Sequence, residues 1–486
     1  MPRAQRLAAL ALVALVAAAG VARGQEALDD EPLRRLDPDT LAGGDYGGTE
    51  PQPLAGGAYG REPQAAPRAA AVEEPLTTQL QIGDPLAGSR AGLGAPPRVP
   101  RARRLADEPY SPTGIRAGAF ILRPTLESTA GYDTNPNEVK SGGRGSAYGR
   151  LRGDLDAVSD WSRHQLEVRL SGQIRKFTNA PEIGLEPQAS ATVDGRIDVT
   201  DDTQIVTQLR ASITTSSPGD PETPTDVDGD EIQKSYGATL GVAKRFNRFS
   251  LQLDGLFDRY LYDDSPLQGG GKLDNSDRIY NAYEVRLRGA YELSPRLQPF
   301  AEIAVDTRDY DRSVDDAGVR RGSDGYALRA GAKFEATRLI AGELALGYGR
   351  QTPKDNSLDP VEGLLIDGSI AWVPTALTTV RLNARSALQE TNLSGASGVL
   401  TRSVGVAVEH ALRRNVLLTA RATVERLDYR GIGRIDDAVT LALEGEYRLN
   451  RSLSLIGSFQ HEKLASSESG EGYSSSIIEV GLRLRR

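Results

Sequence analysis

Cysteine is absent from this chain of 486 residues, and this absence excludes several kinds of chemistry. Without thiols the chain cannot form disulfide bonds, use a cysteine nucleophile, or carry a lipid on an N-terminal cysteine. Basic residues do not outnumber acidic ones either, because the formal net charge is -8, which argues against a nucleic-acid partner. Long uncharged apolar runs are also scarce. One such run lies near the start, and no candidate transmembrane helix follows it.

The first residues have the organisation of a secretory signal peptide. Arg3 and Arg6 form a basic start, Leu7 to Val21 form an apolar run, and Ala22-Arg23-Gly24 ends on small residues. The run is short for a membrane anchor, which is the alternative interpretation. We therefore expect residues 1–24 to be a signal peptide that is cleaved after export.

Residues 25–112 differ in composition from the rest of the chain. Proline, glycine, alanine and charged residues dominate, and neither the helical nor the strand period is sustained. Leu41–Gly47 (LAGGDYG) recurs as Leu54–Gly60 (LAGGAYG). We expect a disordered periplasmic tail, because such a composition cannot bury enough apolar surface to fold. The alternative is that these short motifs bind peptidoglycan or a partner protein.

From Ile115 onward, apolar and polar residues alternate along successive runs. Between Asn281 and Tyr291, one face carries Tyr283, Val285 and Leu287, and the other face carries charged residues. A turn at Leu293–Arg296 joins this run to a similar one, as in a β-hairpin. Long strands with one densely charged face suit a barrel with lipid outside and a wet lumen inside. The mean hydropathy of -0.39 does not oppose this, because alternation hides the lipid-facing residues from the average.

Connections between the runs are short and long in turn. This asymmetry is typical of barrels whose two ends face different compartments, and the runs number about 18, an even number. The sequence therefore predicts an all-β fold, a transmembrane antiparallel up-and-down β-barrel over residues 113–486. The precursor would be exported through the inner membrane, and the mature protein would lie in the bacterial outer membrane.

The segment Gly114–Glu127 (GIRAGAFILRPTLE), followed by Gly131–Asn137 (GYDTNPN), resembles the first strand of the β-barrel porin type 2 family. The resemblance covers residues 114–486. It implies an outer-membrane protein of proteobacteria, from a family commonly found in exopolysaccharide contexts. The family supplies no catalytic residues to carry over. The chain departs from most outer-membrane barrels at its end, Leu484-Arg485-Arg486, where an aromatic residue is usual.

The sequence offers no convincing catalytic, cofactor or metal site. His164, His410 and His461 stand in separate runs without the spacing of metal ligands or of a catalytic triad. Asp226–Asp230 (DVDGD) begins like a calcium loop, but the glycine and the bidentate glutamate that such a loop requires are missing. We therefore expect no enzyme activity, no cofactor and no metal.

Charged residues on the predicted inner face are the strongest functional signal. Both signs are interleaved, which would favour the passage of polar or charged solutes. The alternative is that the charges pair across strands and fill the barrel. The candidate lumen-lining residues are Arg150, Arg152, Asp154, Arg169, Arg175, Asp194, Arg196, Glu284, Arg286, Arg288, Glu302, Asp306, Arg381, Arg385, Glu444 and Arg483.

These features predict a porin-like pore for polar solutes. Two alternatives stay open: an accessory barrel for exopolysaccharide export, and a non-conducting structural barrel tethered through its N-terminal tail. The expected partners are outer-membrane lipid and the outer-membrane assembly machinery, with polysaccharide or peptidoglycan as further candidates. No nucleic-acid partner is expected.

Overall fold

The computed structural model describes residues 110–180, 183–220, 222–223, 227, 229–267 and 269–486. The expected signal peptide and all but the last residues of the expected tail lie outside this part of the chain. The described residues form eighteen long strands of 12 to 16 residues each. The strands are β2 (Phe120–Asp133), β3 (Ser146–Ser159), β4 (Gln165–Phe177), β5 (Leu185–Asp198), β6 (Thr203–Ser216), β7 (Glu231–Phe246), β8 (Phe249–Tyr262), β11 (Tyr280–Tyr291), β12 (Leu297–Tyr310), β13 (Ser323–Thr337), β14 (Ile340–Pro353), β15 (Val361–Thr375), β16 (Thr378–Gln389), β17 (Gly398–Arg413), β18 (Val416–Arg430), β19 (Ile435–Arg448), β20 (Leu453–Ser466) and β21 (Tyr473–Arg485).

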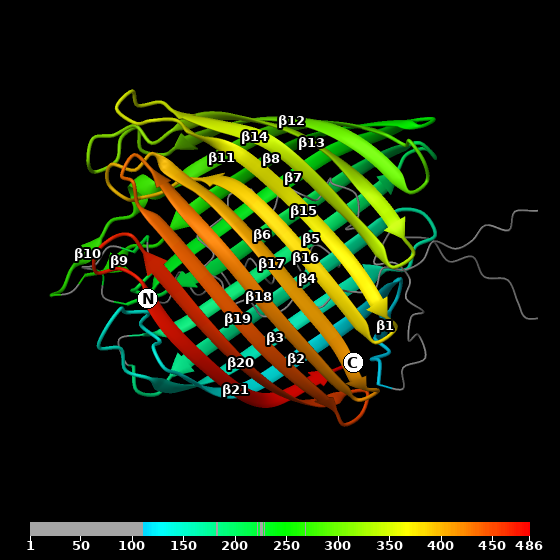
Figure 1. Cartoon of the computed structure of the whole chain (residues 1–486), viewed down its shortest axis with the longest axis horizontal. Coiled ribbons are helices and arrows are strands. Elements are labelled where there is room, and N and C mark those ends of the chain that lie inside the picture. Colours follow the sequence, from blue (N-terminus) through cyan, green and yellow to red (C-terminus); the bar gives the residue numbers. More distant parts are fainter. Residues whose placement is uncertain (1–109, 181–182, 221, 224–226, 228, 268) are drawn as a thin grey trace, which may run out of the picture. The chain divides into compact units, whose positions relative to one another are not determined.

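Each long strand pairs antiparallel with its neighbour in the chain, and the last strand pairs with the first (Figure 1). The closing ladder between β2 and β21 runs from Thr125 opposite Arg485 to Asp133 opposite Ile477. Closure leaves no sheet edge with unpaired backbone groups, which a membrane-spanning sheet requires. The predicted antiparallel up-and-down barrel of about 18 strands is confirmed.

Four small elements accompany the barrel wall. Strand β1 (Ile115–Ala117) folds back on the start of β2 through a turn at Gly118, whose φ of 59° suits glycine. Strands β9 (Ser265–Pro266) and β10 (Lys272–Leu273) pair with each other in the connection between β8 and β11. The short 3-10 helix η1 (Ser276–Arg278) completes that connection. No helix among the described residues is both long and apolar enough to cross a membrane.

The connections alternate in length as the sequence indicates. The turns after β3, β5, β7, β11, β13, β15, β17 and β19 are short, and the connections at the other end are mostly longer. Both ends of the described chain lie at the short-turn end. The Asp160 N–H donates to the Ala119 carbonyl at 2.7 Å, and the Arg486 N–H donates to the Pro124 carbonyl at 3.2 Å.

The outer face of the barrel is apolar and exposed. Leu240, Leu364 and Val480 are each more than 60% exposed, which is unusual for large apolar side chains on a protein surrounded by water. Exposed aromatic residues gather near the two ends of the strands on the same face. Trp161, Phe249 and Tyr291 lie near short turns, and Tyr132 and Tyr283 lie near the long connections. Two aromatic girdles around an apolar band are typical of outer-membrane barrels.

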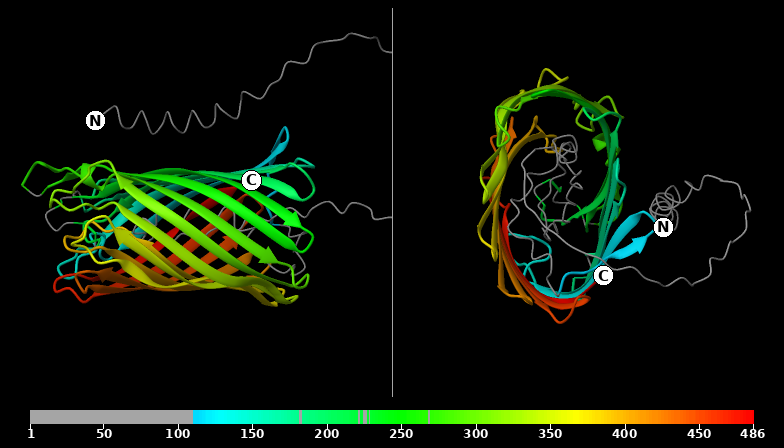
Figure 2. Two further views of the ribbon diagram at one scale, coloured as in Figure 1. Left: turned by 90° about the horizontal axis from the view of Figure 1, so that it is seen from above. Right: turned by 90° about the vertical axis from the view of Figure 1, so that its right-hand side faces the viewer.

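The barrel is oval in section (Figure 2, right). Strands β11 to β14 curve around one narrow end, and β20, β21, β2 and β3 curve around the other. Two broader walls, β4 to β8 and β15 to β19, connect them. Buried apolar clusters lie mainly toward the long connections, for example Tyr148, Phe177, Ile183 and Ile477.

Candidate functional site in the barrel interior

Charged side chains occupy the inner face because strand residues alternate between the two faces. On β11, Glu284 and Arg286 are 7% and 4% exposed, whereas Leu287 is 39% exposed on the outside. The same parity holds on β12, where Glu302 is buried and Ile303 is exposed. The structure therefore places these charged residues inside the barrel wall, away from the apolar band.

The first dense group of charges lies at the narrow end formed by β11 to β14, and we call it the β11–β14 cluster. Arg286 forms an ion pair with Glu284 and lies 3.9 Å from Glu302. Arg288 reaches the Glu343 carboxylate of β14 at 3.0 Å, passing over β12 and β13. Because each cation faces carboxylates from neighbouring strands, these buried charges are neutralised in place.

The second dense group lies where the barrel closes, and we call it the seam cluster. Arg483 of β21 contacts three carboxylates: Glu127 of β2 at 2.6 Å, Glu444 at 3.0 Å and Glu446 at 3.1 Å. Glu127 is also the register partner of Arg483 across the closing ladder. An opposite-charge pair directly across two strands stabilises their pairing. Arg483 therefore helps to fix the register in which the barrel closes.

The other predicted lumen residues belong to smaller groups along the walls. Arg150 binds Glu479 at 2.8 Å beside the seam cluster. Arg385 stands opposite Asp367 in the ladder between β15 and β16. The remaining pairs are Arg152 with Asp154 (2.8 Å), Arg169 with Asp194 (2.6 Å), Arg175 with Glu186, Arg196 with Asp198 (3.2 Å), Asp306 with Arg308 (3.7 Å) and Arg381 with Glu409 (3.9 Å).

Charged side chains at the narrow ends are less exposed than those on the broad wall. The side chains of Arg286 and Arg483 are 4% and 7% exposed, whereas those of Arg169 and Arg196 are 49% and 42% exposed. Water therefore reaches the charges on the β4–β5 part of the wall but scarcely reaches the two clusters. Such an arrangement can bind and orient polar solutes along the broad walls, while the clusters brace the narrow ends.

Several ion-pair partners of the predicted lumen residues were not themselves predicted from the sequence, including Glu127, Glu343, Glu446 and Glu479. Each stands on the inner face of its strand, so the alternation itself was the signal that could have found them. Glu222 and Glu390 were also missed. They lie in long connections, where no periodic signal exists.

Acidic groups gather at the long-connection end of the barrel, outside the strands. Burial raises the pKa of Asp220 to about 6 and the pKa of Glu222 to about 7. Burial likewise raises the pKa of Asp230 to about 7, with the nearby Glu186 adding to the shift. These carboxyl groups therefore lose their protons at a higher pH than ordinary carboxyl groups do.

The three histidines lie in separate parts of the barrel, and each lies within hydrogen-bond distance of a backbone or hydroxyl group. His164 accepts a hydrogen bond from the Asp198 N–H at 3.1 Å; His410 lies 3.0 Å from the Thr378 hydroxyl and His461 lies 2.9 Å from the Ser476 hydroxyl. Within the described residues, no group of three or more acidic or histidine side chains could hold a metal ion. Asp226 and Asp228 of the Asp226–Asp230 motif lie outside the described part.

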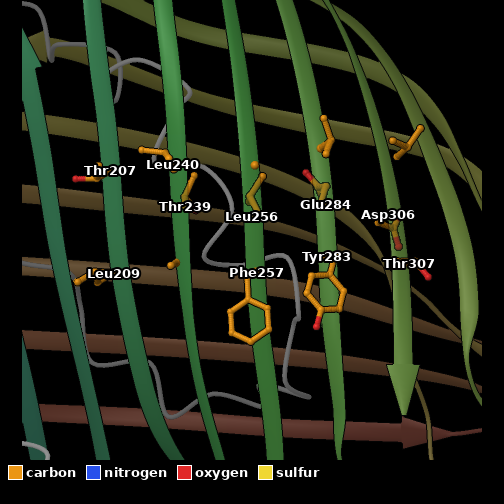
Figure 3. A pocket seen from close by; sticks show the side chains of 14 residues that line it. Thr207, Leu209, Thr239, Leu240, Leu256, Phe257, Tyr283, Glu284, Asp306 and Thr307 are labelled. Atoms are coloured by element: carbon orange, nitrogen blue, oxygen red, sulfur yellow. The ribbon is translucent and has the colours of Figure 1, made fainter. Parts of the chain in front are cut away.

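A hollow of about 760 Å³ lies against β6, β7, β8, β11 and β12 (Figure 3). Its lining includes Leu209, Leu240, Phe257 and Tyr283. Leu240 is 61% exposed on the outer face, and Tyr283 is 47% exposed on the same face. This hollow therefore belongs to the apolar outer wall, and we do not place a polar solute there.

The chain was compared with curated proteins and with solved structures. No curated protein matches the sequence. Similar solved structures include the copper transporter OprC, with 10% identity and a TM-score of 0.44 over 76% of this chain and 82% of that chain. OccAB4 of Acinetobacter baumannii has 10% identity and a TM-score of 0.39 over 75% of this chain and 98% of that chain. A BenF-like porin of Pseudomonas fluorescens Pf-5 has 10% identity and a TM-score of 0.39 over 76% of this chain and 99% of that chain.

The family assignment does not depend on these distant structures. The sequence profile described as "Putative beta-barrel porin 2" matches residues 108–486, which include every strand of the barrel. The resemblance noted at Gly114–Glu127 and Gly131–Asn137 lies within this match. The chain therefore belongs to this family of β-barrel porins.

Proposed function

We propose that the protein is an outer-membrane pore for small polar solutes. The supporting observation is the interior: a closed barrel carries interleaved arginine and carboxylate side chains on its inner face, and the apolar side chains face outward. On the broad wall, water reaches Arg169 and Arg196, so a hydrated path borders charges of both signs. The function is passage of solutes, without a chemical reaction.

In this proposal, the chain reaches the outer membrane after cleavage of its signal peptide. Lipid covers the apolar band, and the outer-membrane assembly machinery inserts the barrel. Polysaccharide and peptidoglycan remain candidate partners of the exposed end and of the tail, respectively.

Uptake into proteoliposomes tests the proposal. Vesicles that contain the refolded full-length chain should swell in iso-osmotic solutions of small sugars or organic acids, and vesicles without protein should not. Permeation should decrease as solute size increases. Vesicles that stay impermeable to every solute would argue against a pore.

A non-conducting structural barrel is the second candidate. It is favoured by the two buried charge clusters, which fill the narrow ends of the interior with paired side chains. The uptake experiment separates the two candidates, because only the pore requires the vesicles to become permeable.

A further inference from the structure

Near its tip, the β16–β17 hairpin separates from β15 but stays paired with β18, because the ladder between β17 and β18 continues to Gly398 opposite Arg430. The ladder between β15 and β16 ends at Asp367 opposite Arg385, whereas the ladder between β16 and β17 continues to Gln389 opposite Val399. Residues 386–400 therefore remain a hairpin after β16 has separated from β15. We call this segment the hairpin tip.

The hairpin tip lies on the inner side of β15. Leu388 and Leu400 of the tip pack against Val361 and Leu365 of β15. On β15, Leu364 is 67% exposed on the outer face, so its neighbour Leu365 points inward. Within the tip, Ala396, Val399 and Leu400 are fully buried, with 0% exposure. The tip therefore folds into the barrel rather than extending beyond its rim.

A buried arginine on the narrow end holds the tip from one side. The Arg308 guanidinium of β12 donates to the Leu388 carbonyl at 2.9 Å and forms an ion pair with Glu390. The hydroxyls of Ser323 and Tyr310 also donate to Glu390, at 3.0 Å and 3.1 Å. Three strands, β13 to β15, separate β12 from β16, so this contact crosses part of the interior.

The connection between β6 and β7 holds the tip from the other side. The Thr391 hydroxyl donates to the Glu222 carboxylate at 2.8 Å, and the Asn392 N–H donates to the same carboxylate at 3.1 Å. The Asn392 side-chain amide donates to the Glu222 carbonyl at 2.8 Å. Six strands separate β7 from β16 in one direction, and eight separate β6 from β17 in the other. The two partners thus start from roughly opposite walls and meet across the opening.

These contacts give the barrel an internal obstruction near its long-connection end. We propose that the hairpin tip, held by Arg308 on one side and Glu222 on the other, is the constriction that limits which solutes pass. The inference rests on the proposed pore function and assigns the residues that set its size limit. The ion pair between Arg308 and Glu390 favours one arrangement of the tip, because breaking a buried, hydrogen-bonded ion pair is costly.

Three variants of the full-length chain test the constriction in planar lipid bilayers. The first replaces Glu390–Gly398 with Asn-Gly, which joins the paired residues Gln389 and Val399 by a two-residue hairpin turn. The second and third are Arg308→Ala and Glu222→Ala. The matched control is Arg426→Ala, which removes an exposed ion pair with Asp437 that does not touch the tip. Heat-modifiable migration on a gel establishes that each variant has folded.

The constriction requires the shortened variant to conduct about twofold more than the wild type, or more, and to admit larger solutes. Glu222→Ala and Arg308→Ala should change conductance in the same direction, and Arg426→Ala should match the wild type. Unchanged conductance and size limit in the folded shortened and Glu222→Ala variants would overturn the constriction, even if Arg308→Ala fails to fold. In that case a conducting wild type would leave the pore intact. If neither the wild type nor the folded shortened variant conducts, the pore itself is overturned.

Discussion

Replacing Leu287 with arginine tests which face of the wall meets lipid. Leu287 lies on the outer face of β11, four residues from Tyr283 and four from Tyr291, which are exposed on the same face. At about 3.3 Å per residue and a strand tilt of about 40°, the two tyrosines lie about 20 Å apart along the barrel axis. This is close to the apolar band of about 25 Å in outer-membrane barrels. Leu287 therefore lies near the bilayer midplane.

An arginine at the midplane should cost about 2–4 kcal/mol of the free energy of unfolding, and close to an interface about 0–1 kcal/mol. The matched control is Val285→Arg, which is on the same face and one step nearer to Tyr283. Its cost should be smaller, because its side chain can reach the interface more easily. The two variants change the same charge on the same strand and differ only in depth.

The assay is equilibrium unfolding by urea of barrels folded into lipid vesicles, followed by tryptophan fluorescence. The account requires Leu287→Arg to lower the unfolding free energy more than Val285→Arg does. Equal and small costs at both positions would mean that this face does not meet a hydrocarbon layer. The assignment of outer and inner faces would then be wrong.

Three further predictions concern the interior and the topology. Burial gives Glu222 a pKa of about 7 against its usual 4.5, so the docked state binds the proton more tightly than the undocked state. Docking of the hairpin tip should therefore be strongest below pH 4.5 and should weaken as the pH rises to about 7. Because a weakly docked tip obstructs the barrel less, conductance should increase over this pH window. The variant Glu222→Gln should abolish this increase. Arg483→Ala removes the cation that Glu127, Glu444 and Glu446 share, although Arg421 still pairs with Glu444 and Arg485 with Glu446. The loss should cost about 3–5 kcal/mol in urea unfolding, and a cost below about 1 kcal/mol would contradict the pairing. Protease added to intact cells should cut the connection at residues 311–322 and spare the turn at residues 292–296; the opposite pattern would invert the orientation of the barrel.

The barrel could be predicted from the sequence because its physical constraint is local. A strand with lipid on one side and water on the other must alternate, and Tyr283 to Arg288 show this alternation directly. The short connections also predicted the order of the strands, since strands joined by a short connection lie side by side in the wall. Neither signal requires knowledge of distant contacts.

The pairing of charges could not be predicted with the same success. Arg483 meets Glu127, which is 356 residues away in the chain, only because the barrel closes at one register. Alternation places both side chains inside but does not say which residues face each other. The extent of burial was also unexpected: a water-filled interior suggests that Arg286→Ala is mild, whereas Arg286 is only 4% exposed beside Glu284 and Glu302. Removing this arginine should therefore be as costly as removing Arg483.

The hairpin tip had no signal in the sequence at all. Ala387, Leu388, Val399 and Leu400 resemble ordinary strand residues, and they are buried on both faces because the tip has separated from β15 and folds into the barrel. Its departure depends on Arg308 and Glu222, which come from other strands and connections. Such long-range contacts are visible only once the barrel has formed.

Single-channel recording of the refolded full-length protein in planar bilayers tests the central claim most directly. The account predicts discrete conductance steps for the wild type or, if the hairpin tip closes the barrel completely, for the shortened variant. A salt gradient across the bilayer would then give a reversal potential that shifts when Arg169 on the broad wall is replaced by alanine. The absence of steps in both the wild type and the folded, shortened variant would contradict the account.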